Sequence, residues 1–216
     1  MLLLAYDHLV GDGWSFWRML DELDQDLART TDAPMAPALD YRAFVQHQQA
    51  WLGGASALRQ RTYWQSELEA PLPLWQLPGD RSDRPVVPFD AGVTSLYLPT
   101  ARHDSLRDAA RRLGGSLYTA LLTAYVVVLH RHAGQHDLVI GSPMPGRTDA
   151  AWQGVVGDFV NAVPIRCRLD EQTTLADLHA MVRAKTMRGL RHQEYPLNLL
   201  VDSLGAAVPL RNGVLS

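Results

Sequence analysis

The sequence predicts an α/β fold in which helices alternate with short strands. Two observations support this prediction. Apolar residues recur at spacings of three and four in several segments, which is the helical period, and short apolar runs with the length of buried strands lie between them. The chain has 216 residues, of which 47% are hydrophobic, so it is long enough to bury one large core or two small ones.

The pattern of the first seventy residues predicts one strand followed by helices. The apolar run from Leu2 to Tyr6 has the length of a buried strand. A glycine-rich turn follows, and a helical period then starts at Phe16, with Ser15 as a candidate N-cap. The expected elements are a strand at 2–6, helices at 16–27, 41–52 and 57–68, and a loop at 30–40, where threonine and proline interrupt the pattern.

Residues 70–92 are rich in proline and have no clear period, which predicts a linker. Beyond this linker, strands and helices alternate. Ser116 and Thr174 stand where N-caps are expected, and Gly134 stands where a helix should end. The expected elements are strands at 93–98, 138–142 and 159–169, and helices at 105–113, 117–132 and 175–191.

The overall charge and the N-terminus exclude several classes of protein. The formal net charge of −3 argues against a nucleic-acid-binding protein, which would carry a basic surplus. The opening run lacks a preceding basic region and is interrupted by Asp7 and His8, so it is neither a signal peptide nor a membrane span. We therefore expect a cytoplasmic protein that has neither nucleic acid nor membrane as a partner.

Cys167 is the single cysteine, which excludes an internal disulfide and a multi-cysteine metal site. Its neighbours Arg166 and Arg168 could favour a reactive thiolate. However, strand alternation places Cys167 on the same face as Val163 and Ile165. We therefore predict a buried and inert thiol.

The densest polar cluster runs from Asp7 to Ser15, directly after the first predicted strand. In this position His8 would lie at the mouth of a sheet, and histidine is the side chain best suited to accept a proton near neutral pH. Asp12 could hold the loop through an ion pair, and Gly13 could adopt a backbone angle that other residues resist. From the spacing alone, a histidine that only completes a strand-to-helix turn remains the simpler interpretation.

Several short motifs then follow one another along the chain. They are Asp7–Gly13, Tyr41-Arg42-Ala43-Phe44, Ile140–Pro143 with Gly146-Arg147, Val156–Asn161, and His192–Pro196. In this order they resemble the signature motifs of condensation domains of non-ribosomal peptide synthetases, which belong to the chloramphenicol-acetyltransferase-like superfamily. The family patterns are His-His-x-x-x-Asp-Gly, Tyr-x-Asp-Phe, Ile-Gly-x-Pro with Gly-Arg and Gly-x-Phe-Val-Asn, and His-Gln-x-Tyr-Pro.

The resemblance implies a two-lobe fold that this chain covers in part. Residues 1–70 would be the last part of the N-terminal lobe, residues 71–92 the crossover linker, and residues 93–216 most of the C-terminal lobe. The chain would correspond to about the middle half of the domain. It also starts inside an apparent strand and ends without a closing element, so we expect an internal fragment that is inactive in isolation.

The resemblance assigns His8 to the catalytic position, with Asp12 and Gly13 supporting the site. One departure is clear, because Asp7 stands where the family has its first histidine. Successive strand residues point to opposite faces, so Asp7 need not reach the site. If its carboxylate did approach His8, it would favour the charged imidazolium and make His8 a poorer base, because less of the neutral ring would be available to accept a proton.

Three further residues have a role implied by the resemblance. Arg147 would pair with Asp12 across the lobe interface and so support the site, while Trp14 and Asn161 would line the substrate channel. A solvated loop arginine and an amide in a strand-edge turn are the simpler alternatives for Arg147 and Asn161. His192 and Tyr195 are expected to serve packing and helix termination, and no set of histidines has the spacing of a metal site.

The implied reaction is amide bond formation between two substrates held as thioesters. Donor and acceptor peptidyl carrier proteins would present them on phosphopantetheine arms, and neighbouring synthetase domains would be further partners. No cofactor would bind this chain directly. A covalent intermediate is not required, which agrees with the absence of a Gly-x-Ser-x-Gly motif.

Three alternatives to this reaction remain open. The altered signature at Asp7 would suit a condensation-like domain that only recruits a partner. An epimerisation domain uses a similar histidine signature, although Trp14 and Ser15 after Gly13 disfavour it. A free-standing acyltransferase that uses coenzyme A is disfavoured by the long motif that ends at Asn161.

Overall fold

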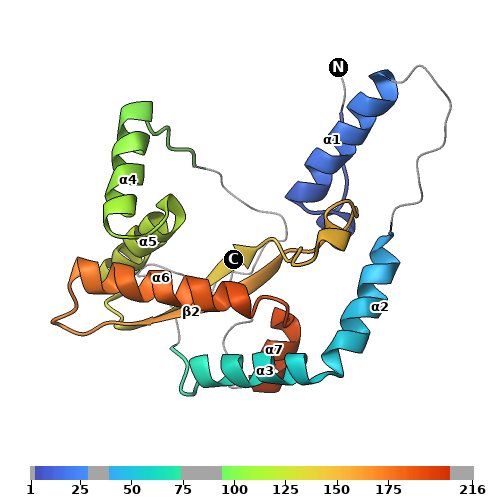
Figure 1. The fold of residues 1–216 in the computed structure, drawn as a ribbon. Coiled ribbons are helices and arrows are strands. Elements are labelled where there is room, and N and C mark those ends of the chain that lie inside the picture. The colour runs from blue at the N-terminus through green and yellow to red at the C-terminus, as the bar shows by residue number, and fades with distance from the viewer. Residues whose placement is uncertain (1–2, 29–38, 74–93, 205–216) are drawn as a thin grey trace, which may run out of the picture. The chain divides into compact units, whose positions relative to one another are not determined.

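The computed structural model describes residues 3–28, 39–73 and 94–204. Helices dominate this part of the chain, which also contains a two-stranded sheet (Figure 1). This mixture agrees with the α/β class predicted from the sequence. The elements are the 3-10 helix η1 (His8–Val10), α1 (Gly13–Ala28), α2 (Tyr41–Leu52), α3 (Ala55–Glu67), α4 (Thr100–Arg112), α5 (Leu117–Ala133), β1 (Asp137–Met144), the 3-10 helix η2 (Ala150–Trp152), β2 (Asn161–Arg168), α6 (Leu175–Arg191) and α7 (Leu197–Leu204).

The predicted helix boundaries are largely confirmed by capping contacts. At the start of α5, Ser116 and Thr119 each accept a hydrogen bond from the other's backbone N–H, which forms a capping box. The same helix ends at Gly134, whose φ of 65° is left-handed. At the start of α6, Thr174 Oγ1 accepts a hydrogen bond from the N–H of Asp177. These local interactions explain why spacing alone locates the helices.

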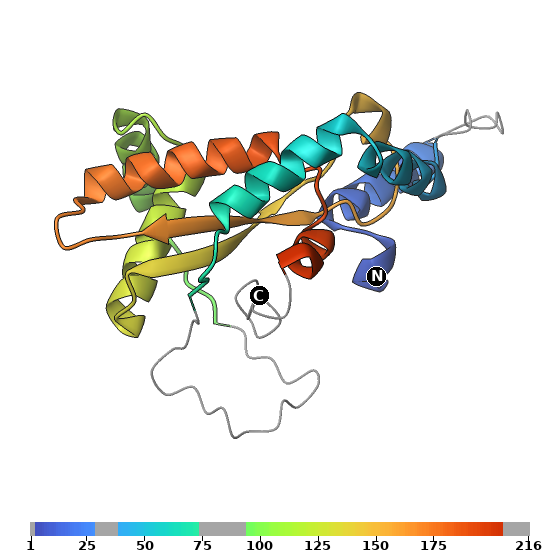
Figure 2. The same cartoon turned by 90° about the horizontal axis from the view of Figure 1, so that it is seen from below.

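The two strands pair antiparallel, since the N–H of Leu169, just after β2, donates to the carbonyl of His136, just before β1, at 2.7 Å. They run side by side in Figure 2. Both faces of β2 are buried: Cys167 is fully buried on one face, and Arg166 is buried on the other, where its guanidinium pairs with Asp137. Burial raises the pKa of the Cys167 thiol to about 11. The predicted burial of Cys167 is therefore confirmed, and its lack of reactivity stays a prediction.

The chain divides into two compact units, and the division falls within both strands. In the first unit, α3 packs against α2 and α7, and α2 contributes aromatic side chains to a small apolar core. In the second, α4 packs against α5. The first unit comprises Met1–Glu69, Gly141–Val163 and Leu190–Val208, and the second Ala70–Ile140, Pro164–Gly189 and Pro209–Ser216. The lobe boundaries expected from the family are a different division of the chain and stay a prediction.

Two predicted strands are wrong within the described residues. Residues 3–6 form no strand, and the Leu3 side chain is 81% exposed. Residues 94–98 also form no strand, and Leu96 and Tyr97 are more than 80% exposed. An apolar run becomes a strand only where a neighbouring backbone bonds to it, and the described residues supply no such neighbour to either segment. Most of the predicted loop at 30–40 and linker at 70–92 lies outside the described residues.

Within the described residues, no single helix is long and apolar enough to cross a membrane. Only α4 and α5 taken together reach the required length and composition, and they are bent by 94° at their junction.

Candidate active site

The loop before α1 places His8 at the protein surface. Asp7 starts η1 by accepting the N–H of Leu9 on Oδ1 at 2.9 Å, and the N–H of Gly11 closes the turn on the carbonyl of His8. The His8 side chain is 74% exposed. The imidazole is therefore open to solvent, as a group that meets a substrate must be. It belongs to a 3-10 turn rather than to the end of a strand.

Asp12, four residues after His8, is the N-cap of α1. Its Oδ1 accepts the N–H of Ser15 at 2.7 Å, and its carbonyl accepts the N–H of Phe16 at 3.0 Å. This corrects the expectation that Ser15 caps the helix. Gly13 is the first residue of the helix, its φ is not left-handed, and a Cβ on it would meet open space. The special backbone angle expected at Gly13 is therefore not present.

Arg147 pairs with Asp12 and makes several further contacts in the protein interior. Its Nη2 lies 3.1 Å from Asp12 Oδ1, and both side chains are at most 2% exposed. Its Nη1 donates to the carbonyls of Trp152 and Val155 at 2.6 and 2.7 Å. The guanidinium carbon also lies 3.8 Å from the ring centroid of Phe159. The expected Asp12–Arg147 ion pair is present, and both residues belong to the first unit.

Ser15 joins this pair to the backbone of Gly157. Its hydroxyl donates to the Gly157 carbonyl at 2.8 Å and accepts the Gly157 N–H at 3.0 Å. Arg147 Nη2 donates to the same hydroxyl at 2.9 Å. We call the group formed by Asp12, Ser15, Arg147 and Gly157 the loop clamp, because it ties the turn that carries His8 to a segment about 140 residues away.

The electrostatics of the clamp favour a charged Asp12. Burial by itself would raise the pKa of this carboxyl. Hydrogen bonds from Ser15, from the N–H of Phe159 and from Arg147 outweigh that effect, so the pKa of Asp12 lies below its ordinary value. The charged carboxylate accepts four hydrogen bonds within 3.3 Å and neutralises the buried guanidinium opposite it.

Two glycines allow the close packing around the clamp. Gly146 has a φ of 66°, and a Cβ there would lie 1.8 Å from the carbonyl oxygen of Phe159. At Gly157 a Cβ would lie 2.1 Å from the ring of Tyr41. The Tyr41 hydroxyl donates to the carbonyl of Asp158 at 2.6 Å. A side chain at either glycine would push apart the segments that hold Arg147 and Asp158.

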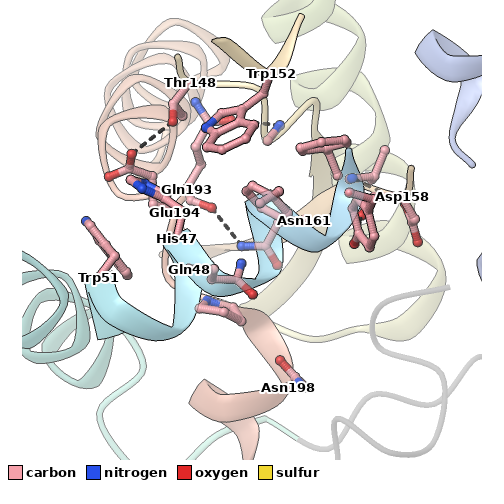
Figure 3. A pocket seen from close by; sticks show the side chains of 16 residues that line it. His47, Gln48, Trp51, Thr148, Trp152, Asp158, Asn161, Gln193, Glu194 and Asn198 are labelled. Atoms are coloured by element: carbon pink, nitrogen blue, oxygen red, sulfur yellow. Dashed lines mark hydrogen bonds between the residues drawn. The ribbon is translucent and has the colours of Figure 1, made fainter. Parts of the chain in front are cut away.

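Asp158 is the acidic residue that pairs with His8 in the part of the chain that the structure describes. Its Oδ2 lies 3.6 Å from His8 Nδ1, and its side chain is 31% exposed. Asp158 also borders a cavity of about 330 Å³ that opens beside α2 (Figure 3). Other residues that line this cavity are Phe44, His47, Trp51, Trp152 and Asn161.

The two predicted channel residues differ in their surroundings. Trp14 is half-exposed, and its indole N–H donates to the carbonyl of Gln153 at 3.0 Å. Asn161 lines the cavity but its amide is occupied. Its Nδ2 donates to the carbonyls of Gln193 and Tyr195 at 2.8 Å, and its Oδ1 accepts the N–H of Leu197. Asn161 thus ties β2 to the segment before α7, and a channel role for either residue stays a prediction.

Sequence reasoning misses three residues of this arrangement. It assigns Ser15 to a cap rather than to the clamp, and it treats Gly157 and Asp158 only as parts of a motif. The motifs contain Ser15 and Gly157, but nothing in their spacing connects these two residues with each other or Asp158 with His8. Within the described residues, no three His, Cys, Asp or Glu side chains lie close enough together to bind a metal ion.

Comparison with known proteins identifies the class to which this fold and site belong. A family model described as the condensation domain matches residues 1–211. The chain therefore belongs to the condensation domain family, of the type found in non-ribosomal peptide synthetases. It is 32% identical over 207 residues to surfactin synthase subunit 1 of Bacillus subtilis (strain 168), and 33% identical over 205 residues to tyrocidine synthase 3 of Brevibacillus parabrevis.

Solved structures confirm the predicted fold. The first condensation domain of the CDA synthetase superposes with a TM-score of 0.77 at 27% identity, over 93% of this chain and 45% of that one. The condensation domain from the Monacolin K polyketide synthase MokA has a TM-score of 0.78 at 22% identity and shares the fold, over 97% of this chain and 48% of that one. The chain thus spans about half of these condensation domains. The sequence matches cover 94% of this chain but 6% of the surfactin synthase and 3% of the tyrocidine synthase.

Proposed function

We propose that this chain contributes the His8 side of an active site that forms amide bonds between two carrier-bound substrates. The donor would be an acyl or peptidyl thioester and the acceptor an aminoacyl thioester. The observation that carries the proposal is the exposed His8 imidazole on a turn fixed by the buried loop clamp. An exposed base on a rigid support can meet a substrate without losing its orientation.

In the proposed reaction, the acceptor amine attacks the donor thioester carbonyl. The new C–N bond forms, the C–S bond breaks, and the donor's thiol leaves with a proton. An α-amino group has a pKa near ~8, so a useful fraction is neutral at pH 7 without a strong base. His8 accepts the proton from the attacking amine or orients that amine, which contributes on the order of 10²–10⁴-fold. Alignment of two tethered reactants adds a comparable factor.

The partners and carriers belong to the same proposal. The two reactants would arrive on phosphopantetheine arms of donor and acceptor carrier proteins, and no cofactor would bind this chain directly. The relatives are multidomain synthetases, and the fold also occurs in a four-domain nonribosomal peptide synthetase. This context supports neighbouring synthetase domains as further partners. The cytoplasmic location expected from the sequence is part of the same proposal.

The test is the His8→Ala variant in the intact synthetase, assayed with loaded donor and acceptor carriers. Product formation should fall by at least about 100-fold. The fold should be unchanged, because the removed side chain is 74% exposed. Full turnover by this variant would remove His8 from the mechanism. Scrambling of the substrate α-proton in deuterated solvent, without condensation, would instead assign epimerisation.

A recruitment domain without catalysis is the second candidate, and Asp7 is the residue that favours it. Its carboxylate caps η1 through the N–H of Leu9, a role that histidine at this position would not reproduce in the same way. If the wild-type synthetase makes no product and Asp7→His restores it, the natural chain is a recruitment domain. Turnover by the wild type rejects this alternative.

A further inference from the structure

A contact between the His8 imidazole and the Asp158 carboxylate connects two motifs that lie 150 positions apart. The 3.6 Å separation joins Nδ1 of the imidazole to Oδ2 of the carboxylate. Nδ1 is the nitrogen nearer the backbone, so this contact leaves Nε2 at the outer end of the exposed ring. The family pattern Gly-x-Phe-Val-Asn leaves the position of Asp158 open, so the motif alone does not predict a carboxylate there.

Hydrogen bonds of Asp158 and of the residue before it hold this aspartate in position. Its Oδ1 accepts the N–H of Val160 at 3.3 Å, and its carbonyl accepts the hydroxyl of Tyr41 at 2.6 Å. The preceding residue, Gly157, is bonded through both its N–H and its carbonyl to Ser15. The carboxylate is thus held relative to the same clamp that holds the His8 turn. The Asp158 side of the contact is therefore fixed by the backbone, and the exposed His8 side chain turns toward it.

Other charged groups near the loop are engaged elsewhere. Asp7 Oδ1 caps the N–H of Leu9. Asp12 and Arg147 are buried against each other. Across residues 3–28, 39–73 and 94–204, the carboxylate in contact with the His8 imidazole is that of Asp158.

We propose that Asp158 is a positioning residue for His8, holding the Nδ1–H so that Nε2 faces the acceptor amine as the proton acceptor. The inference rests on the proposed function of His8. A neutral imidazole carries its proton on one nitrogen, and a carboxylate beside Nδ1 selects the tautomer with the proton there. The lone pair of Nε2 is then free to take the amine proton. Once it does, the negative charge of Asp158 stabilises the imidazolium, as the carboxylate of a serine-protease triad does.

The distance agrees with this role. At 3.6 Å the imidazole and the carboxylate are neighbours, but they are farther apart than in a hydrogen bond. Rotation of the exposed His8 side chain can shorten it, and hydrogen bonds of catalytic groups are commonly long without substrate and tighten in the complex. Asp158 also borders the cavity beside α2 (Figure 3).

The first test measures the tautomer of His8 by ¹⁵N NMR on the full chain with labelled histidine. In the wild type the Nδ1–H form should predominate, and Asp158→Asn should shift the population toward Nε2–H. Asp7→Asn is the matched control, because it removes a neighbouring charge while the amide oxygen can still accept the Leu9 N–H. An unchanged tautomer in Asp158→Asn, or an equal shift in Asp7→Asn, overturns the proposal.

The second test is kinetic and uses the intact synthetase with loaded carriers. Asp158→Asn should lower kcat by about tenfold, because a hydrogen bond to a charged group contributes about 1.5 kcal/mol at the lower end of its range. KM for the acceptor carrier should not change, and Asp158→Glu should recover part of the rate. A rise in KM with kcat intact would contradict a positioning role. If His8→Ala retains full turnover, the proposed function fails, whereas the NMR result still decides whether Asp158 orients His8.

Discussion

Removal of the Asp12 carboxylate should destabilise the protein far more than removal of the His8 imidazole. In Asp12→Ala, the guanidinium of Arg147 stays buried without its counter-charge, and the N–H groups of Ser15 and Phe159 lose their acceptor. Breaking a buried ion pair by removing one partner costs about 3–5 kcal/mol. A domain has only about 5–15 kcal/mol of total stability, so this loss is a large share of it.

The assay is thermal unfolding followed by circular dichroism, with His8→Ala as the matched control. For a chain of this size, 1 kcal/mol shifts Tm by about 2–4 °C, so Asp12→Ala should lower Tm by about 10 °C. His8→Ala changes an exposed side chain and should stay within about 2 °C of the wild type. Equal melting temperatures for the two variants would refute the structural role of Asp12.

The same pair predicts the pH dependence of stability. The pKa of Asp12 is lower in the folded protein than its ordinary value of 3.8, so the folded state favours the charged form. This contribution is complete above the unfolded value and is lost as pH falls through the lower, folded value. The difference in unfolding free energy between the wild type and Asp12→Asn should therefore shrink as pH falls below about 4. A difference that stays constant from about pH 7 to about pH 2 would show that the charge of Asp12 is not what stabilises the clamp.

Two further predictions concern close packing and burial. Gly146→Ala should lower the unfolding free energy by at least about 3 kcal/mol, because the new Cβ overlaps the carbonyl of Phe159. Gly134→Ala, which has the same left-handed φ but open space around it, should cost only about 1–2 kcal/mol, and equal costs in denaturant melts would refute the steric argument. Cys167 should react with iodoacetamide at about pH 8 roughly 100-fold more slowly in the folded protein than in urea, because its pKa is raised to about 11. Similar rates in both states would mean that the thiol is not held in the core.

The helices are predictable from the sequence because the interactions that define them are local. The Ser116 cap, the left-handed Gly134 and the Thr174–Asp177 contact each involve residues within a few positions of one another. Apolar spacing gives the buried face of such a helix directly. For this reason the pattern locates α5 and α6 to within a residue or two of their ends.

The strands are less predictable because their stability depends on distant partners. The runs at 2–6 and 93–98 have the composition of strands, yet the described parts of both are unpaired. The run at 159–169 contains a strand because β1 lies beside it. Composition indicates which segments tend to form strands, whereas pairing with a neighbouring segment decides whether a strand forms.

The site likewise has contacts that the sequence predicts and contacts that it does not predict. The motifs locate Asp12 and Arg147, and the expected ion pair between them is present. They do not reveal that Ser15 belongs to the clamp, since its contacts with Gly157 cross 142 positions. The contact between His8 and Asp158 likewise depends on how two segments meet, which no periodicity describes.

The signature motif contains both buried residues that support the turn and an exposed residue that the turn carries. Asp12, Ser15 and Arg147 are buried and fix the turn, while the His8 side chain is exposed to solvent. The change from histidine to Asp7 lies outside the clamp, because the Asp7 carboxylate bonds to Leu9 at the start of η1. The altered position can therefore change the chemistry beside His8 without loosening its support. A variant series at position 7 should accordingly move turnover and leave the melting temperature close to that of the wild type, whereas changes within the clamp should move both.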